Sequence, residues 1–381
     1  MVFDLIVIGG GAAGFYGAIH AGELDSRLKI LILEKSHKLL SKVRVSGGGR
    51  CNVTHDCSDP VKLAQHYPRG DKALRQVFKN HHAFNTMTWF ASKNIKLKAE
   101  EDGRVFPVTD TSQTIIDCFL SQCERLKIKI QTGAEVVSIR RTPHEFLVEC
   151  ASGIVYNGLH VLIATGGSPK PDAYSFISKL GHTITPPIPS LFTFNDKEKK
   201  FIDLMGVAVP GAEVRIVGTK LRKQGPVLIT HWGLSGPAVI KLSAWGAEYL
   251  HSVGYDFHVL VSWIGNVKED TIREFLVAQK NARGKQRIHN HSLFDLPQRL
   301  WVRLCNLAEI PDEKIWGELA HRNLNKLLEY MIRCPFHILG KTTFKDEFVT
   351  CGGVDLQEVD LSTMESKLID GLYFAGEVLN V

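Results

Sequence analysis

The chain has 381 residues, of which 44% are hydrophobic and 23% charged, and its formal net charge is +6. These are the proportions of a folded globular protein, and they exclude a disordered or low-complexity chain. The length exceeds that of a typical single domain, so we expect two or three domains. The positive charge is compatible with a polyanionic partner but does not demand one.

The eight cysteines include no Cys-x-x-Cys pair, so we expect no metal site and no thioredoxin-type redox centre. A chain of this length builds a core without disulfides, which favours reduced thiols and a cytoplasmic protein. The N-terminus lacks the basic and apolar regions of a signal peptide. The sequence contains no run of about 18 apolar residues, the length needed to span a membrane, so no membrane partner is expected.

The first predicted strand is Leu5–Ile8, a short aliphatic run typical of a buried parallel strand. The segment Gly9-Gly10-Gly11-Ala12-Ala13-Gly14 follows it and has the G-x-G-x-x-G spacing of dinucleotide-binding loops. Gly9 permits a tight turn, Gly11 lets a pyrophosphate approach the backbone, and Gly14 lets the next helix pack closely on the sheet. The N-terminus of that helix offers N–H groups and a partial positive charge to phosphates.

A second predicted strand, Leu28–Leu33, ends at Glu34. In dinucleotide-binding proteins a carboxylate about 20 residues after the glycine loop binds the ribose diol, and Glu34 stands at about that distance along the sequence. Lys35 is adjacent, but no basic cluster follows that would bind a 2′-phosphate. The order of strand, glycine loop, helix, strand and acid predicts a dinucleotide site, although it does not separate a nicotinamide from a flavin.

The segment Ser46-Gly47-Gly48-Gly49-Arg50-Cys51-Asn52 favours a flavin. Its three glycines predict a loop whose backbone N–H groups can approach a large planar ligand. Cys51 is a candidate catalytic residue that could donate a proton or contact the ring, and the alternative is that it packs the loop. Arg50 could steady an anionic flavin or substrate, and the alternative is a surface salt bridge.

Residues 60–130 are predicted to be helical with short breaks. Alternating or apolar runs then predict strands at 127–131, 135–140, 145–150, 153–157 and 160–164. Prolines at 186, 187 and 189 favour a domain boundary. Short strand patterns from 191 to 263 predict a barrel-like β structure, a helical pattern covers 268–333, and the chain is expected to return to the first domain at 341–353.

His231 precedes a Gly-Leu-Ser-Gly-Pro turn and is a candidate general acid, the alternative being a structural histidine. Ser235 does not form a nucleophile elbow, because Pro237 stands where glycine is required, and we expect it to cap a helix. Two basic runs, Lys280–Arg287 and Lys62–Lys79, could contact RNA phosphates, the alternative being solvated surfaces.

Six segments together resemble the BaiN/YhiN-type NAD(P)/FAD-dependent oxidoreductases, a family of bacterial flavoproteins, over nearly the whole chain. They are residues 9–14, 46–52, 103–107, 164–167, 231–237 and 371–378. The resemblance implies an α/β fold with a glutathione-reductase-type Rossmann FAD domain. We expect that domain at 1–190 plus 341–381, an inserted barrel-like domain at 191–265 and a helical subdomain at 266–340.

The resemblance implies FAD as cofactor and NAD(P)H as a transient electron donor, for which no second glycine fingerprint is visible. In this family the backbone at Val137 brackets the adenine and the acid at Glu377 binds the ribityl chain. Together with the motifs above, the resemblance predicts cofactor contacts at Gly9, Gly11, Ala12, Ala13, Gly14, Glu34, Lys35, Ser46, Gly47, Gly49, Arg50, Cys51, Asn52, Val137, Ala164, Thr165, Gly166, Gly376 and Glu377. Because the sequence stops at Val381, we expect it to lack the glycine-rich segment with which the family closes over the flavin.

The activity implied by the resemblance is hydride transfer from reduced flavin to an activated C=C bond of a small molecule. The alternatives are reduction of uridine in ribosomal RNA, oxidation of an amine, and a non-catalytic flavin- or RNA-binding protein. Reduction of a small molecule and reduction of uridine share one chemistry, because uridine also contains a conjugated C=C bond.

Overall fold

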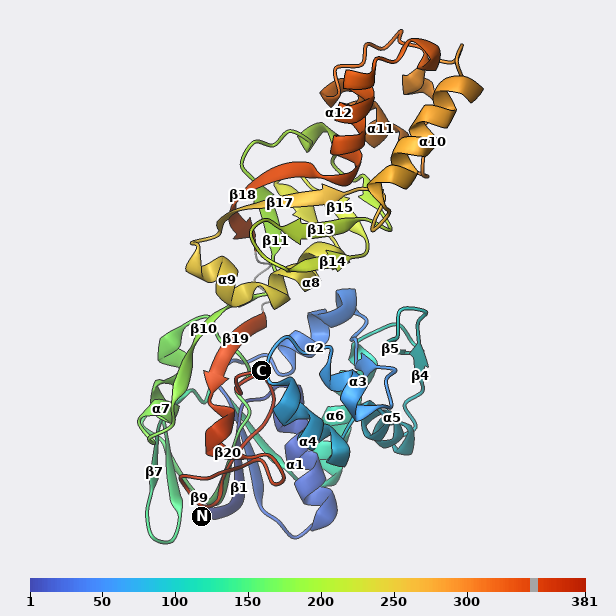
Figure 1. The fold of residues 1–381 in the computed structure, drawn as a ribbon. Coiled ribbons are helices and arrows are strands. Elements are labelled where there is room, and N and C mark those ends of the chain that lie inside the picture. The colour runs from blue at the N-terminus through green and yellow to red at the C-terminus, as the bar shows by residue number, and fades with distance from the viewer. Residues whose placement is uncertain (343–348) are drawn as a thin grey trace. The chain divides into compact units, whose positions relative to one another are not determined.

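The computed structural model describes residues 1–342 and 349–381, which form two compact units (Figure 1). Unit 1 contains Met1–Ile188 and Lys345–Val381, and unit 2 contains Pro189–Phe344. The sequence predicts domain boundaries at 190/191 and 340/341. The structure divides the chain into its two units at 188/189 and 344/345. The barrel-like and helical segments, between which the sequence predicts a boundary at 265/266, share one hydrophobic core within unit 2.

The centre of unit 1 is a parallel sheet of aliphatic strands, in the order β22-β9-β1-β2-β6. Its strands are β1 (Val2–Ile8), β2 (Ile30–Glu34), β6 (Lys129–Thr132), β9 (Val155–Ile163) and β22 (Leu372–Phe374). Ile8 at the end of β1 lies opposite Leu33 on one side and Ile163 on the other. The loops that follow β1, β2, β9 and β22 therefore meet at one edge of the sheet, where open α/β sheets bind ligands.

β9 is one long strand where the sequence predicted two. Its first half pairs antiparallel with β8 (Phe146–Cys150), and its second half lies parallel between β1 and β22. β8 also pairs with β7 (Val136–Arg141). Gly158 stays in the strand because a Cβ there would lie 2.8 Å from the side chain of Ile6, so this glycine serves close packing and does not break the strand.

The prediction of helices across residues 60–130 is partly wrong. Four helices are present: α3 (Pro60–Ala64), α4 (Asp71–Asn80), α5 (Ala83–Ser92) and α6 (Gln113–Arg125). Between α5 and α6, however, the chain forms β4 (Leu97–Ala99) and β5 (Arg104–Pro107), which join β3 (Thr54–His55) in a small sheet. Val105 and Phe106 of β5 are fully buried, and this burial outweighs the helical pattern around them.

The remaining elements of unit 1 flank the sheet. They are α1 (Ala12–Leu24), α2 (Ser41–Val45), α7 (Ser175–Ser178), β19 (Val349–Val354), which pairs with β10 (Ile184–Ser190), and β20 (Val359–Asp360) and β21 (Glu365–Ser366), which extend the sheet beyond β22. The helices α1 and α6 pack against each other. Cys118 and Cys123 lie buried on α6, and none of the eight cysteines, all of which lie in the described residues, forms a disulfide.

Unit 2 is built on an antiparallel sheet in the order β12-β15-β16-β11-β18-β17-β13-β14. Its strands are β11 (Thr193–Asp196), β12 (Ala208–Val209), β13 (Glu213–Ile216), β14 (Arg222–Gln224), β15 (Val227–Ile229), β16 (Gly233–Ser235), β17 (Asp256–Ser262) and β18 (Cys334–Thr342). Helix α8 (Pro237–Trp245) contacts strands from both halves of this order, including β11, β13, β14 and β16. The sheet therefore curves around α8, which explains its barrel-like pattern.

Four further helices complete unit 2: α9 (Ala247–Ser252), α10 (Glu269–Ala282), α11 (Gln298–Leu307) and α12 (His321–Ile332). Leu300, Trp301 and Leu328 are among the residues that join these helices to the core of the sheet. The expected helix cap at Ser235 is wrong, because Ser235 pairs with Leu228 in the sheet and Gly236 occupies the cap position of α8. Within residues 1–342 and 349–381, every helix is too short or too polar to cross a membrane.

Candidate functional site

Three glycines in the β1–α1 loop and the first turn of α1 have different roles. Gly9 has a φ of +116°, and a Cβ there would lie 2.3 Å from the carbonyl oxygen of Ala164. A Cβ at Gly14 would lie 2.0 Å from the carbonyl oxygen of Gly9, so the fold itself requires both glycines. Gly11 has an extended backbone with a φ of −94°, and no atom lies within 4 Å of where its Cβ would be. The space beside Gly11 is open to a ligand.

The N-terminus of α1 faces this space without a cap of its own. The helix begins at Ala12, which is exposed, and no side chain hydrogen-bonds to its N-terminal N–H groups. The first N–H groups of a helix have no acceptor within the helix, and the helix dipole adds a partial positive charge there. This combination suits the pyrophosphate of a dinucleotide.

Glu34 lies at the end of β2 beside the same loop. Its Oε2 accepts a hydrogen bond of 2.7 Å from the N–H of Gly10, and its Oε1 accepts one of 2.9 Å from the N–H of Ser36. Each carboxylate oxygen retains a lone pair, so Glu34 can also accept hydrogen bonds from ribose hydroxyls. Lys35 is exposed next to it. The structure therefore brings the predicted acid to the predicted phosphate loop.

The loop at Ser46–Asn52 presents its backbone to open space. Gly48 and Gly49 have φ angles of +69° and +87°, and a Cβ on either would meet no atom within 4 Å. Asn52 is exposed, whereas Gly47 packs against Phe106, because a Cβ there would lie 2.7 Å from that ring. Three consecutive left-handed glycines thus form an exposed turn whose amides can contact a ligand.

Arg50 and Cys51 in this loop both interact within unit 1. Arg50 forms an ion pair of 2.6 Å with Glu100, and its guanidinium lies 4.0 Å from the centre of the Phe106 ring. Cys51 is 5% exposed and belongs to the hydrophobic core beneath the loop. Burial raises the pKa of the Cys51 thiol, and a hydrogen bond with Ser46 opposes this shift. The neutral buried thiol fits the packing alternative better than a proton donor.

The loop after β22 completes the edge of the sheet. Gly376 has a φ of +76°, and a Cβ there would lie 2.9 Å from the Cβ of Ala13 in α1. Glu377 accepts a hydrogen bond of 3.0 Å from the N–H of Thr350 and forms an ion pair of 2.9 Å with Lys42. Lys42 and Thr350 were not predicted, because no motif of the sequence includes them.

The other predicted cofactor residues lie at the same edge or beside it. Ala164 is buried, while Thr165 is exposed and Gly166 has a φ of +71° with no atom near its Cβ position. Val137 is 42% exposed and lies at an irregularity in the β7–β8 register, where Val136 and Ser138 pair with consecutive residues of β8. This bulge leaves the backbone of Val137 outside the ladder, as contact with an adenine requires.

These features fit a flavin dinucleotide. The carboxyl edge of the sheet combines an uncapped helix N-terminus, open space beside Gly11, an acid with spare acceptor capacity and an exposed glycine turn. Neutral backbone donors face the position expected for the phosphates, and Glu34 and Glu377 lie where sugar hydroxyls would need acceptors. This edge is therefore the candidate cofactor site of unit 1.

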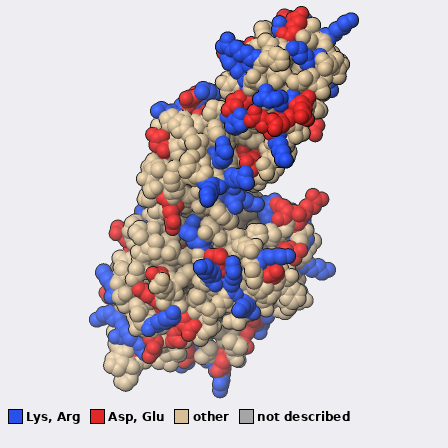
Figure 2. Space-filling model, viewed as in Figure 1, with Lys and Arg blue, Asp and Glu red and all other residues tan. Residues whose placement is uncertain are grey.

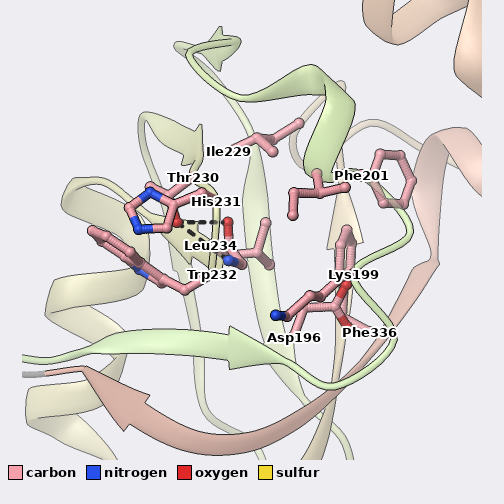
Figure 3. Close-up of a pocket in the computed structure, with 11 residues that line it drawn as sticks. Asp196, Lys199, Phe201, Ile229, Thr230, His231, Trp232, Leu234 and Phe336 are labelled. Atoms are coloured by element: carbon pink, nitrogen blue, oxygen red, sulfur yellow. Dashed lines mark hydrogen bonds between the residues drawn. The ribbon is translucent and has the colours of Figure 1, made fainter.

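A second candidate site is a pocket in unit 2 (Figure 3). It is lined by Asp196, Lys199, Phe201, Ile202, Ile229, Thr230, His231, Trp232, Gly233, Leu234 and Phe336. Figure 3 shows His231 and Trp232 side by side, and their ring centres are 4.2 Å apart at an angle of 73°. His231 is exposed, so its imidazole can reach a bound molecule. Cys51 and His231, the two predicted catalytic residues, belong to different units.

Asp196 is the residue of this pocket that sequence reasoning missed. It is 5% exposed, and its carboxylate accepts a hydrogen bond of 3.3 Å from the N–H of Glu198. Burial raises the pKa of the Asp196 carboxyl. Asp196 and His231 both line the pocket, and an acid whose pKa is shifted by burial in a pocket is a candidate for a functional site. The only signal in the sequence is an acid at the end of a predicted strand, which is too common to single it out.

The predicted RNA-binding run Lys280–Arg287 makes contacts within its own unit. Lys280 donates a hydrogen bond of 2.9 Å to the carbonyl of Leu319, and Arg287 forms an ion pair with Glu313. Both cations therefore stabilise the helical part of unit 2. In the other predicted run Arg75 pairs with Asp71 of α4 at 3.2 Å. The two runs are thus partly neutralised, which weakens the phosphate-binding prediction for them.

Comparison with known proteins identifies relatives along the whole chain. The family described as HI0933-like protein Rossmann domain matches residues 3–381. A protein of Escherichia coli named ribosomal RNA dihydrouridine synthase is 30% identical over 100% of this chain and 92% of its own length. A 3-dehydro-bile acid delta(4,6)-reductase of Clostridium scindens is 26% identical over 98% of this chain and 92% of its own length.

A solved structure shares the fold. The 3-ketosteroid-delta4-(5alpha)-dehydrogenase of Rhodococcus jostii, solved with 4-androstene-3,17-dione, aligns with a TM-score of 0.50. The alignment covers 99% of this chain and 91% of that protein at 12% identity. At this identity the likeness concerns the fold alone.

Proposed function

Because this chain belongs to the HI0933-like family, we propose that it reduces the C=C bond of a uracil ring in RNA with an FAD cofactor. The family match confirms the predicted BaiN/YhiN-type resemblance, the Rossmann-like FAD-binding fold and the class of FAD-dependent oxidoreductase. The substrate class and the electron donor go beyond that match and are proposals.

One observation carries the choice of substrate. The relative with 30% identity over the whole chain is named for making dihydrouridine in ribosomal RNA. Conversion of uridine to dihydrouridine adds a hydride and a proton across the C=C bond of the uracil ring. The bile acid relative is named for reducing C=C bonds of a small molecule, so both names describe the same change in different substrates. A conjugated small molecule is therefore the second candidate substrate.

The residues of unit 1 would bind and orient the cofactor. The N–H groups at the start of α1 would hold the pyrophosphate beside Gly11, and Glu34 would accept hydrogen bonds from the adenosine ribose. The exposed turn at Gly48 and Gly49 would offer its amides to the ring system. FAD, when bound, supplies the hydride chemistry, for which we propose NAD(P)H as the reductant.

The proton must come from a group outside the cofactor. We assign it to His231, whose exposed imidazole lines the pocket of unit 2, as does buried Asp196. An imidazolium can donate a proton near neutral pH, whereas the neutral thiol of Cys51 is enclosed in the core of its loop. Cys51 accordingly has a packing role in this mechanism.

Reduction of RNA and of a small molecule can be compared directly. The FAD-loaded protein is incubated without oxygen with NADPH or NADH, and loss of flavin absorbance identifies the donor. Ribosomal RNA transcribed in vitro, which lacks dihydrouridine, is then added, and its nucleosides are analysed by mass spectrometry. Dihydrouridine formation is the expected result. If the protein reduces a 3-dehydro-bile acid but forms no dihydrouridine, the substrate is a small molecule and not RNA. If the reduced flavin transfers its hydride to neither substrate, C=C reduction is refuted.

A further inference from the structure

Unit 2 carries a group of cations on the β13–β14 hairpin and the adjoining helix α8. The group, which we call the hairpin patch, consists of Arg215, Lys220, Arg222, Lys223 and Lys241. Arg215, Lys220, Arg222 and Lys241 are exposed. None of the five forms an ion pair with any residue in the described ranges 1–342 and 349–381. Figure 2 shows Lys and Arg side chains gathered over β14 and α8.

One face of the hairpin holds two arginines directly opposite each other. Arg215 on β13 is the cross-strand partner of Arg222 on β14. Like charges at directly opposed positions destabilise an antiparallel pair, so folding alone does not favour this arrangement. The same face contains one acid, Glu213, whose cross-strand partner is Gln224. The pair of guanidiniums therefore retains a net positive charge.

The opposite face carries a lysine pair next to an aromatic ring. The Nζ of Lys223 lies 3.7 Å from the centre of the Trp245 ring of α8. Burial lowers the pKa of Lys223, and the charge of Lys241 lowers it further. The two ammonium groups thus repel each other without an anion between them. An external anion would relieve this repulsion.

Other cations of unit 2 are treated differently. Arg273 and Arg333 both pair with Glu269, and Arg303 pairs with Asp203. These three arginines are therefore neutralised within the chain, whereas no ion pair among the described residues neutralises the cations of the hairpin patch. The hairpin patch lies at one edge of the sheet of unit 2, where β14 pairs only with β13 in the strand order.

We propose that the hairpin patch binds the phosphate backbone of the RNA substrate. This inference rests on the proposed function for its choice of polyanion. The patch extends over two opposite faces of an edge hairpin, so a flat membrane surface would contact only part of it, while a flexible phosphate chain can follow it from one face to the other. Arginine pairs bind phosphate oxygens bidentately, and lysines add point charges along the path.

The test compares two double variants of the full-length FAD-loaded protein. R222Q/K241Q removes one cation from each face of the patch, and R283Q/K285Q removes the same charge from the basic run at the end of α10. Binding of a fluorescein-labelled RNA oligonucleotide is followed by anisotropy at several salt concentrations. The patch variant should raise Kd about tenfold and lower the slope of log Kd against log salt by about 1.4, which is about 0.7 for each lost phosphate contact. The R283Q/K285Q control should stay close to the parent protein.

Equal losses in both variants would show an effect of net charge only and would overturn the proposal, as would unchanged binding by R222Q/K241Q. Binding of vesicles of anionic phospholipid that depends on the patch, with no RNA binding, would assign the patch to a lipid surface instead. Thermal melting of each variant checks the fold, and relief of the Arg215–Arg222 repulsion should leave the melting temperature unchanged or higher.

Failure of this inference and failure of the proposed function give different results. If dihydrouridine forms but R222Q/K241Q binds RNA like the parent, only the assignment of the surface is wrong. If RNA binds through the patch but no dihydrouridine forms, only the proposed reaction is wrong. If both hold, the patch variant should raise KM for RNA with little change in kcat and with an unchanged rate of flavin reduction by NAD(P)H.

Discussion

Gly11→Val is the substitution that best separates cofactor binding from folding. The extended backbone at Gly11, with a φ of −94° and a ψ of −174°, suits valine, and no atom lies within 4 Å of its Cβ position. The cost to the fold should be about 1 kcal/mol or less, mainly from a poorer helix N-cap. The valine methyl groups would fill the space proposed for the pyrophosphate. We expect the affinity for FAD to fall at least about 100-fold, or about 2.8 kcal/mol.

The matched control is Gly9→Ala, two residues away. Its φ of +116° and the 2.3 Å approach of its Cβ to Ala164 should cost about 1–3 kcal/mol in backbone strain alone, whether or not FAD is present. Flavin per chain is measured by absorbance after reconstitution, and stability by thermal melting without FAD. Parental flavin content in Gly11→Val would refute the assigned site. If Gly11→Val lost as much stability as Gly9→Ala, a side chain at position 11 would disturb the fold, and the conclusion that the space beside Gly11 is open would be refuted.

Three further substitutions test other parts of unit 1. Glu34→Gln keeps the shape of the side chain but replaces one of the two oxygens that accept hydrogen bonds from the N–H groups of Gly10 and Ser36. The Kd for FAD in a fluorescence titration should therefore rise about tenfold. An unchanged Kd would argue against a ribose contact. Lys42→Met breaks an exposed ion pair and should change the free energy of unfolding by less than about 1 kcal/mol in urea titrations; a larger loss would assign the pair a structural role. Burial lowers the pKa of His182 below 6.5, so the folded chain binds fewer protons there than the unfolded chain, and stability should fall as the pH drops through and below that value. The melting temperature should be lower at about pH 5.5 than at about pH 7.5, and His182→Gln should reduce that difference, whereas an equal difference would exclude His182 as its source.

Local motifs were enough to predict that Glu34 lies beside the glycine loop. Gly9, Gly11 and Glu34 occur within one strand-helix-strand unit, and short-range geometry brings them together. Lys42 and Thr350 could not be predicted in the same way. They meet Glu377 only through long-range pairing, because β9 lies between β1 and the C-terminal strand β22 and pairs with both.

The errors have a common physical cause, since tertiary packing overrode local patterns. The strands predicted at 153–157 and 160–164 are one strand, β9, in which Gly158 packs against Ile6. Ser235 looked like a helix cap, but the β15–β16 pairing places it in a strand. Lys280 looked like a free cation in sequence, although the carbonyl of Leu319, distant in the chain, accepts its hydrogen bond.

The contact of Gly376 with Ala13 has a consequence for how the protein is made. Residues near the start of the chain receive their last neighbours from residues near position 376, after all of unit 2 has been synthesised. Unit 2 is continuous in sequence and can fold while the parallel sheet of unit 1 still lacks β22. The edge of the sheet that we propose for FAD is therefore complete only after residues near position 376 have been synthesised, although its glycine loop is made early.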